Sequence, residues 1–305
     1  MAGFVAWLVR YRLRRVAFVA GLFLLPITSV ISAAIIVLTA DLKGPAEAAK
    51  DMVLAFVVLA VVMLLPAGDA SPVPFLVSVS LSWSIALLMG AVSYRYRSLT
   101  LVVQLALVLV VAAMLLFVAV VGDVAAFWQQ LLTSTLAELP SDLVTDLTAE
   151  FTAQGITTEQ MVALVSQILT PAFAVGLLVS SLMAVLLGCS WASAARNESF
   201  GQRFRGLKLG YVIGGFAAVM GILSLFGFAL ASGLLLIVSI GFMLQGIAVL
   251  YCWAEHKQWP GAWWAAVVLP LVFMPVMPVP SLFMGFGLAA TGFIDNWYTL
   301  RPKTA

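Results

Sequence analysis

The polar side chains able to bind a small molecule lie singly within long apolar runs of this chain. Gln104 lies about one turn into the run 98–121, and Gln245 lies near the middle of the run 231–253. An amide buried in hydrocarbon requires a hydrogen-bond partner, which can be a ligand or a neighbouring helix. Ser82, beside Trp83, belongs to a ladder of alternating serines that can bind a ligand or their own helix backbone. Both interpretations remain open for these four candidate substrate-binding residues.

The same runs lack the residues that catalysis requires. The only histidine is His256, and no Asp, Glu, Lys, Arg or His lies in the middle of a predicted span. Intramembrane enzymes, pumps and proton relays depend on such ionisable groups. The two cysteines, Cys189 and Cys252, show neither metal-ligand spacing nor a disulfide framework. We therefore expect that the protein is not an enzyme and holds no metal or cofactor.

The composition indicates that transmembrane helices position these residues. Apolar residues make up 64% of the chain and charged residues 9%, against about 25% charged residues in soluble domains. The apolar runs approach the ~20 residues of a spanning helix and lack the alternation of a β-barrel strand. The predicted fold class is an all-α, polytopic transmembrane helical bundle with about 8 to 10 membrane segments. The predicted segments are 16–40, 52–66, 73–93, 98–121, 169–192, 207–229, 231–253 and 262–296.

The distribution of charge predicts the orientation of this bundle. The region 122–168 carries six acidic residues and no Lys or Arg, so we expect it outside the cell. Prolines near the middle of both end segments break or kink a helix: Pro26 in the first, and Pro275, Pro278 and Pro280 in the last. If both segments fold back as hairpins, all fifteen Lys and Arg residues and both termini lie in the cytoplasm of a bacterium, beneath its inner membrane. Kinked single spans, with the N-terminus outside, are the alternative.

The acidic region is predicted to form an amphipathic helical insertion at 123–167, in two or three short helices. Pro140 ends the first helix and Gly155 the second, and Thr157 with Gln160 matches a capping box before the third. This insertion is either a hydrophilic connector or a lid or docking surface. At the other end of the chain, Asp295 is expected to pair with Arg301 or to cap a helix.

Several stretches resemble a known family. SAAIIVL at 32–38 with LKGP at 42–45, FRGLKL at 204–209, LQGIAV at 244–249 and GFIDNW at 292–297 are similar in order and spacing to the YybS-like family of uncharacterised bacterial membrane proteins. The resemblance implies a helical bundle distantly similar to the S components of energy-coupling-factor vitamin transporters. Tyr251 stands where family members often carry histidine, and it completes the set of candidate substrate-binding residues.

Two functions remain open at this stage. An S-component-like binding or transport subunit would take a neutral substrate, because no charged group lies within the spans, and would work with an ATPase module. A non-catalytic scaffold for envelope assembly would instead bind other membrane proteins. The lipid bilayer is a partner in both cases, and a net charge of only +2 makes nucleic acid an unsuitable partner.

Overall fold

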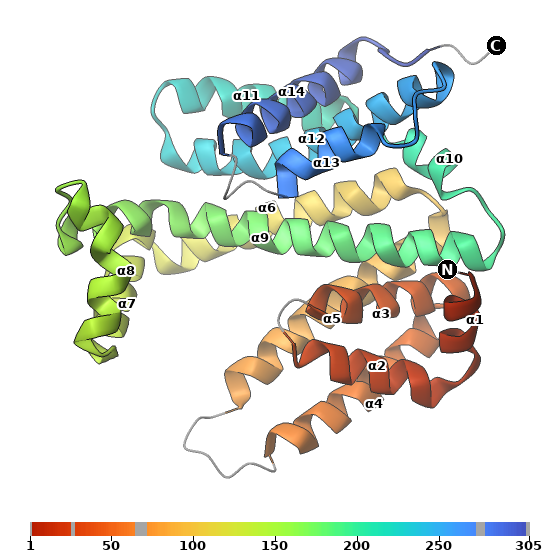
Figure 1. The fold of residues 1–305 in the computed structure, drawn as a ribbon, viewed down its shortest axis with the longest axis horizontal. Coiled ribbons are helices and arrows are strands. Elements are labelled where there is room, and N and C mark those ends of the chain that lie inside the picture. Colours follow the sequence, from red (N-terminus) through yellow and green to blue (C-terminus); the bar gives the residue numbers. More distant parts are fainter. Residues whose placement is uncertain (1, 26–27, 65–71, 273–277, 303–305) are drawn as a thin grey trace.

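The computed structural model describes residues 2–25, 28–64, 72–272 and 278–302 (Figure 1). Within these ranges the regular elements are helices and no strand occurs, which confirms the predicted all-α class. Four of the described helices are long and apolar enough to cross a membrane, namely Phe75–Tyr96, Leu99–Val121, Thr158–Ala195 and Ala229–His256. A fifth apolar helix, Gly210–Leu225, is shorter.

Two long helices, α6 (Leu99–Val121) and α9 (Thr158–Ala195), run through the centre of the molecule between two lobes (Figure 1). The first lobe holds α1 (Ala2–Arg10), α2 (Arg12–Phe23), α3 (Ser29–Lys43), α4 (Pro45–Leu64) and α5 (Val73–Tyr96). The second holds α10 (Phe200–Arg205), α11 (Gly210–Leu225), α12 (Ala229–His256), α13 (Trp263–Val272) and α14 (Pro278–Trp297). Helices α7 (Val124–Glu138) and α8 (Ser141–Ala153) lie at one end of α9, and α1 and α10 lie at the other (Figure 1).

Both end segments consist of two helices. The segment predicted at 16–40 is formed by α2 and α3, and the segment predicted at 262–296 by α13 and α14. Ser32 Oγ on α3 donates a hydrogen bond to the Val19 carbonyl on α2 at 2.7 Å, which joins the first pair. Pro26 and Pro275 lie outside the described residues, whereas α14 begins at Pro278. Proline suits the start of a helix because its missing N–H would have no partner there.

The acidic region differs from the prediction at its C-terminal boundary. Thr157 Oγ1 accepts from Gln160 N, and Gln160 Oε1 accepts from Thr157 N, so the predicted capping box is present. The helix that follows does not end near residue 168. It continues through Pro171 to Ala195 as α9, because a membrane helix tolerates an internal proline when neighbouring helices pack around it. The insertion therefore consists of α7 and α8, and the span predicted at 169–192 begins at Thr158.

Helix α3 forms the core of the first lobe. All its residues from 32 to 41 are buried between α5 and α9. Glycines permit this close approach: a Cβ at Gly90 of α5 would lie 2.6 Å from Ala40 Cβ, and a Cβ at Gly188 of α9 would lie 2.7 Å from the Ala34 carbonyl oxygen. Small residues at helix contacts allow the van der Waals packing that holds helices together in a membrane.

The second lobe depends on an even closer contact between α12 and α14. A Cβ at Gly246 would lie 2.0 Å from the Leu288 carbonyl oxygen, and a Cβ at Gly292 would lie 2.0 Å from the Phe242 carbonyl oxygen. These obstacles are backbone atoms, so no side chain can rotate away to make room. The two glycines therefore fix the separation of the two helices.

We expect Gly246→Ala to destabilise the protein, although alanine has the higher helix propensity. Overpacking of this kind costs about 1–3 kcal/mol, and here the helices themselves must move. Thermal unfolding of the detergent-solubilised protein would measure the loss. Gly215→Ala on α11 is the matched control, since nothing lies within 4 Å of its added Cβ. Equal unfolding temperatures for the two variants would contradict the assigned contact.

Candidate functional site

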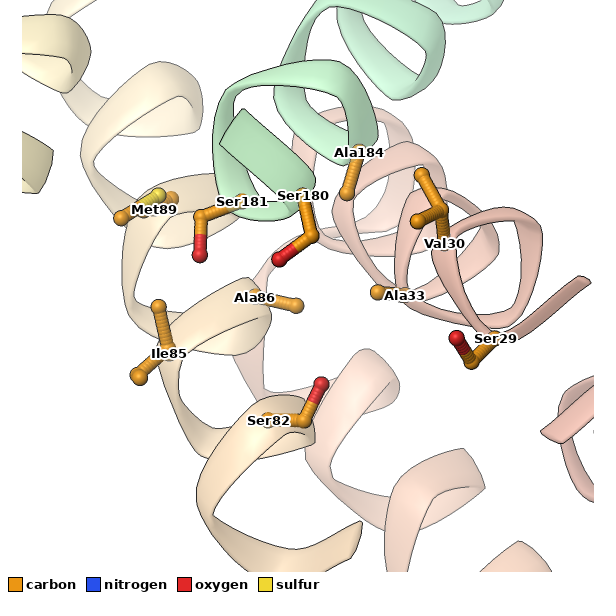
Figure 2. Close-up of a pocket in the computed structure, with 10 residues that line it drawn as sticks. All are labelled: Ser29, Val30, Ala33, Ser82, Ile85, Ala86, Met89, Ser180, Ser181 and Ala184. Atoms are coloured by element: carbon orange, nitrogen blue, oxygen red, sulfur yellow. The ribbon is translucent and has the colours of Figure 1, made fainter. Parts of the chain in front are cut away.

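A small cavity lies between α3, α5 and α9 (Figure 2). Its volume is about 60 Å³, and serines from all three helices contribute to its wall together with small apolar residues. No charged side chain lines it. The lining residues are Ser29, Val30, Ala33, Ser82, Ile85, Ala86, Met89, Ser180, Ser181 and Ala184.

The serine hydroxyls give the cavity its capacity for hydrogen bonding. Figure 2 shows the Ser82 and Ser180 oxygens directed into the space between the three helices. Ser180 Oγ donates to the Leu177 carbonyl at 3.0 Å and keeps its lone pairs as acceptors. Within the described ranges, neither Ser82 nor Ser181 has a hydrogen-bond partner. A molecule in the cavity therefore meets two hydroxyls free to donate or accept.

The first turn of α3 forms one wall of this cavity. Helix α3 begins at Ser29, which lines the cavity with Val30 and Ala33. The side chain of the preceding Thr28 does not cap the helix and donates instead to the Leu22 carbonyl. The N-terminus of a helix carries a partial positive charge. The cavity therefore borders the end of α3 that carries this partial positive charge.

Of the five residues predicted to bind substrate, only Ser82 lines this cavity. Trp83 is fully buried on α5, and its Nε1 donates to Ser32 Oγ at 3.1 Å, which ties α5 to the α2–α3 pair. Tyr251 lies on α12 in the other lobe, where its ring contacts the rings of Phe204 and Trp263. These two aromatic residues thus belong to packing contacts.

Gln104 and Gln245 bind the backbone of the same residue. Leu209 N donates to Gln245 Oε1 at 2.8 Å, and Gln104 Nε2 donates to the Leu209 carbonyl at 2.8 Å. Asn296 does the same for the next residue, because it accepts from Gly210 N at 3.0 Å and donates to the Gly210 carbonyl at 2.7 Å. The non-helical stretch 206–209 and the first residue of α11 thus find their partners on α6, α12 and α14. Of the two interpretations of the glutamines, the structure supports interhelical hydrogen bonds.

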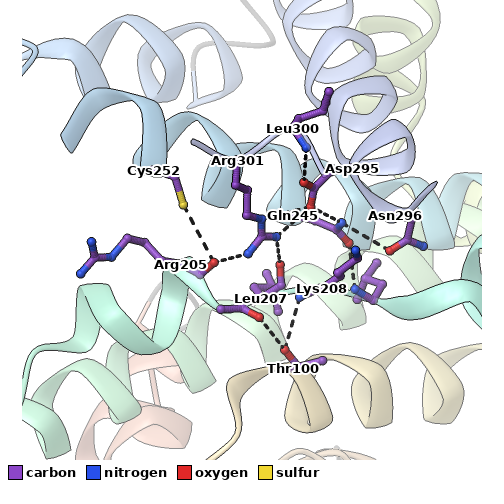
Figure 3. Close-up of polar contacts among 12 residues, drawn as sticks. Thr100, Arg205, Leu207, Lys208, Gln245, Cys252, Asp295, Asn296, Leu300 and Arg301 are labelled. Carbon is purple, nitrogen blue, oxygen red and sulfur yellow. Dashed lines mark hydrogen bonds and ion pairs between the residues drawn. The ribbon is translucent and has the colours of Figure 1, made fainter. Parts of the chain in front are cut away.

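Asp295 completes this cluster (Figure 3). Its side chain is fully buried, and Oδ2 accepts from Arg301 Nη2 at 2.8 Å and from Gln245 Nε2 at 2.9 Å. Arg301 also donates to the carbonyls of Arg205 and Leu207. The expected Asp295–Arg301 pair is therefore confirmed. Through Arg301 it joins the C-terminal end of α14 to the chain segment that precedes α11.

Two further buried carboxylates, Asp41 and Asp51, received no role from the sequence. Asp41, in the last turn of α3, is fully buried and lies 3.0 Å from Arg196 Nη1, with Arg203 and Arg97 at 3.8 and 3.9 Å. Both aspartates directly adjoin a predicted apolar segment, on the side of the bundle that carries the basic residues. An acidic residue in such a place predicts a buried ion pair, because the nearby arginines attract it.

Asp51 forms the equivalent pair on α4. Its Oδ2 accepts from Arg15 Nε at 2.6 Å and its Oδ1 from Arg12 Nε at 2.9 Å. Arg15 is itself buried, so α2 is fixed to α4 through this carboxylate.

No family model matches this chain, and no curated protein or solved structure matches it either. The resemblance to the YybS-like family stays a prediction, and the function must be inferred from the geometry of the chain itself.

We expect Asp295→Ala to lower the free energy of unfolding of the protein relative to the wild type. Removing one partner of a buried ion pair costs about 3–5 kcal/mol, because the other charge is left buried without compensation. Glu255→Ala is the control: it breaks the more exposed Arg205–Glu255 pair, for which a loss below about 1 kcal/mol is expected. Chemical denaturation in detergent would compare the two. Similar losses would contradict the assigned role of Asp295.

Proposed function

We propose that this chain is a multi-pass inner-membrane protein that binds a small, uncharged solute carrying hydroxyl or carbonyl oxygens, as a binding or transport subunit. The observation that supports this best is the convergence of serines from three helices on one cavity beside the start of α3. Pockets that bind small molecules combine an apolar wall with a few convergent polar groups. Serine hydroxyls supply hydrogen-bond donors. The N-terminus of α3 adds a positive electrostatic potential that favours an oxygen acceptor.

The size and charge of the cavity restrict the ligand. A buried water needs about 10–15 Å³ of such space, so a cavity of about 60 Å³ holds the equivalent of about four waters. A vitamin-sized molecule exceeds this volume. With no charged group on the wall, an ionic solute would lose its hydration without compensation. Short polyols and small amides fit both restrictions.

The depth of the cavity suits a binding or transport protein. Ser29 and Asp41 are twelve residues apart on α3, which corresponds to about 18 Å along the helix. Asp41 lies among the arginines that we assign to the cytoplasmic side. In a hydrocarbon layer about 30 Å thick, the cavity therefore lies near mid-depth, where transporter sites are commonly found.

Helices α7 and α8 favour a second candidate function, the scaffold. Both helices project from one end of the molecule (Figure 1), and Leu131, Leu143 and Leu147 are exposed on them. Exposed apolar side chains on an extramembrane helix can bind a protein partner. Deletion of 124–153 separates the two functions, because a scaffold would lose its protein partners while the serine cavity, which receives no residue from this region, would remain.

We expect Ser82→Ala combined with Ser181→Ala to weaken solute binding by about fivefold per hydroxyl, the effect of losing one hydrogen bond of about 1 kcal/mol. Proteoliposomes exposed to glycerol or acetamide, with osmotic reswelling followed by light scattering, would measure solute entry. Ser78→Ala combined with Ser84→Ala is the control, since these exposed serines on the same helix do not line the cavity.

If wild-type proteoliposomes swell no faster than protein-free ones with either solute, passage of these solutes is refuted. Binding without passage would still appear as a glycerol- or acetamide-dependent rise in unfolding temperature that the double variant lacks, and absence of both effects contradicts the proposal.

A further inference from the structure

Helix α1 is too short to span a membrane and presents two different faces. Its nine residues extend about 14 Å. Val5 and Leu8 are buried against the rest of the bundle, whereas Phe4 and Trp7 are 49% and 42% exposed. The Phe4 and Trp7 rings stack at 6.0 Å. The helix therefore lies on the bundle, and its Phe4 and Trp7 rings contact Phe18 of α2 on one side and stay exposed on the other.

Basic residues surround this aromatic face in excess over acids. Six basic residues lie in and around α1 and at the junction of α3 with α4, against three acids, Asp41, Glu47 and Asp51. Asp41 is paired with Arg196 at 3.0 Å. Asp51 is occupied by Arg12 and Arg15, and Glu47 by Lys50 at 2.7 Å. The six basic residues are Arg10, Arg12, Arg14, Arg15, Lys43 and Lys50.

Arg14 joins the aromatic and the basic parts of this surface. Its guanidinium carbon lies 4.4 Å from the ring centroids of both Trp7 and Tyr11, a distance at which cation–π attraction acts. Arg10 lies 5.4 Å from the Tyr11 ring on the exposed side of the helix. The two arginines are therefore positioned beside rings that suit the boundary between hydrocarbon and water.

Lys43 shows that the positive charge here is not balanced locally. Lys43 Nζ and Arg15 Nη1 both donate to the Val9 carbonyl, at 2.7 and 2.8 Å, where α1 ends. Burial lowers the pKa of Lys43, and the charge of Arg15 lowers it further, against the opposing effects of Asp51 and Glu47. Arg15 is paired with Asp51, whereas Lys43 has no carboxylate within 4.0 Å among the described residues, so its charge is available to an anion.

We infer that α1 and the adjoining basic residues form a binding surface for the headgroups of anionic phospholipids. Phe4, Trp7 and Tyr11 lie in the interfacial layer, where aromatic rings are enriched, and Arg10 and Arg14 contact the phosphate groups. Arg12 and Arg15 hold Asp51 and keep α1 in place. A soluble anion would use the cations alone, whereas a lipid also covers the exposed rings. This surface is separate from the serine cavity and depends only on membrane insertion.

The test is native mass spectrometry of the full-length protein in micelles containing equal amounts of phosphatidylglycerol and phosphatidylcholine. We expect the wild type to retain phosphatidylglycerol preferentially, and 0.5 M salt to weaken this preference. Arg10→Gln combined with Arg14→Gln should lower it by about fivefold per charge removed. Arg10→Lys combined with Arg14→Lys should retain most of it, because the charges remain.

The control variant, Lys208→Gln combined with Lys257→Gln, removes the same charge from the second lobe and should leave the preference unchanged. Equal retention of both lipids by the wild type would overturn the proposal, as would an equal loss in the control variant. Displacement of phosphatidylglycerol by 10 mM inorganic phosphate would also overturn it, since the site would then bind free phosphate. Unfolding temperatures of all variants would separate loss of binding from loss of folding.

Discussion

Three buried carboxylates paired with arginines hold one end of this bundle together. Asp51 fixes α2 to α4, Asp41 joins α3 to the end of α9 and to α10, and Asp295 joins α14 to the chain leading into α11. A buried charge without a partner is strongly destabilising. Each pair therefore determines which helix ends are in contact. The packing along the rest of each helix must be compatible with these contacts.

The packing along the helices is achieved without charge. Helix α3 lies between α5 and α9 because glycines at 90 and 188 allow their backbones to approach it. Helices α12 and α14 meet through Gly246 and Gly292 in the same way. In a membrane the hydrophobic effect does not drive helices together, so contacts of this kind and interhelical hydrogen bonds supply the attraction. The charged end sets the arrangement of the helices, and the glycines set their separations.

The proposed site lies where this packing is interrupted. The serines face one another at the start of α3, next to the break in the first segment, and no bulky side chain fills the space between them. The two glutamines, which were also candidates for ligand binding, are occupied by the backbone of Leu209. A strong hydrogen-bonding group buried in hydrocarbon finds a partner within the protein, whereas a serine can satisfy part of its capacity on its own helix and keep the rest for a ligand.

The sequence by itself determined the local features of this protein. Hydropathy runs predicted helices, the capping box at Thr157 and Gln160 predicted the start of α9, and the prolines predicted that both end segments divide. These features depend on neighbouring residues, whose spacing along a helix is known. The partners of Asp41, Asp51 and the two glutamines were decided by the tertiary structure. Gln104 and Leu209 are 105 residues apart, and nothing in the pattern of either run specifies that α6 will lie beside the start of α11. The serine cavity depends in the same way on three helices meeting, because a void is a property of the packing and has no signature in any one segment.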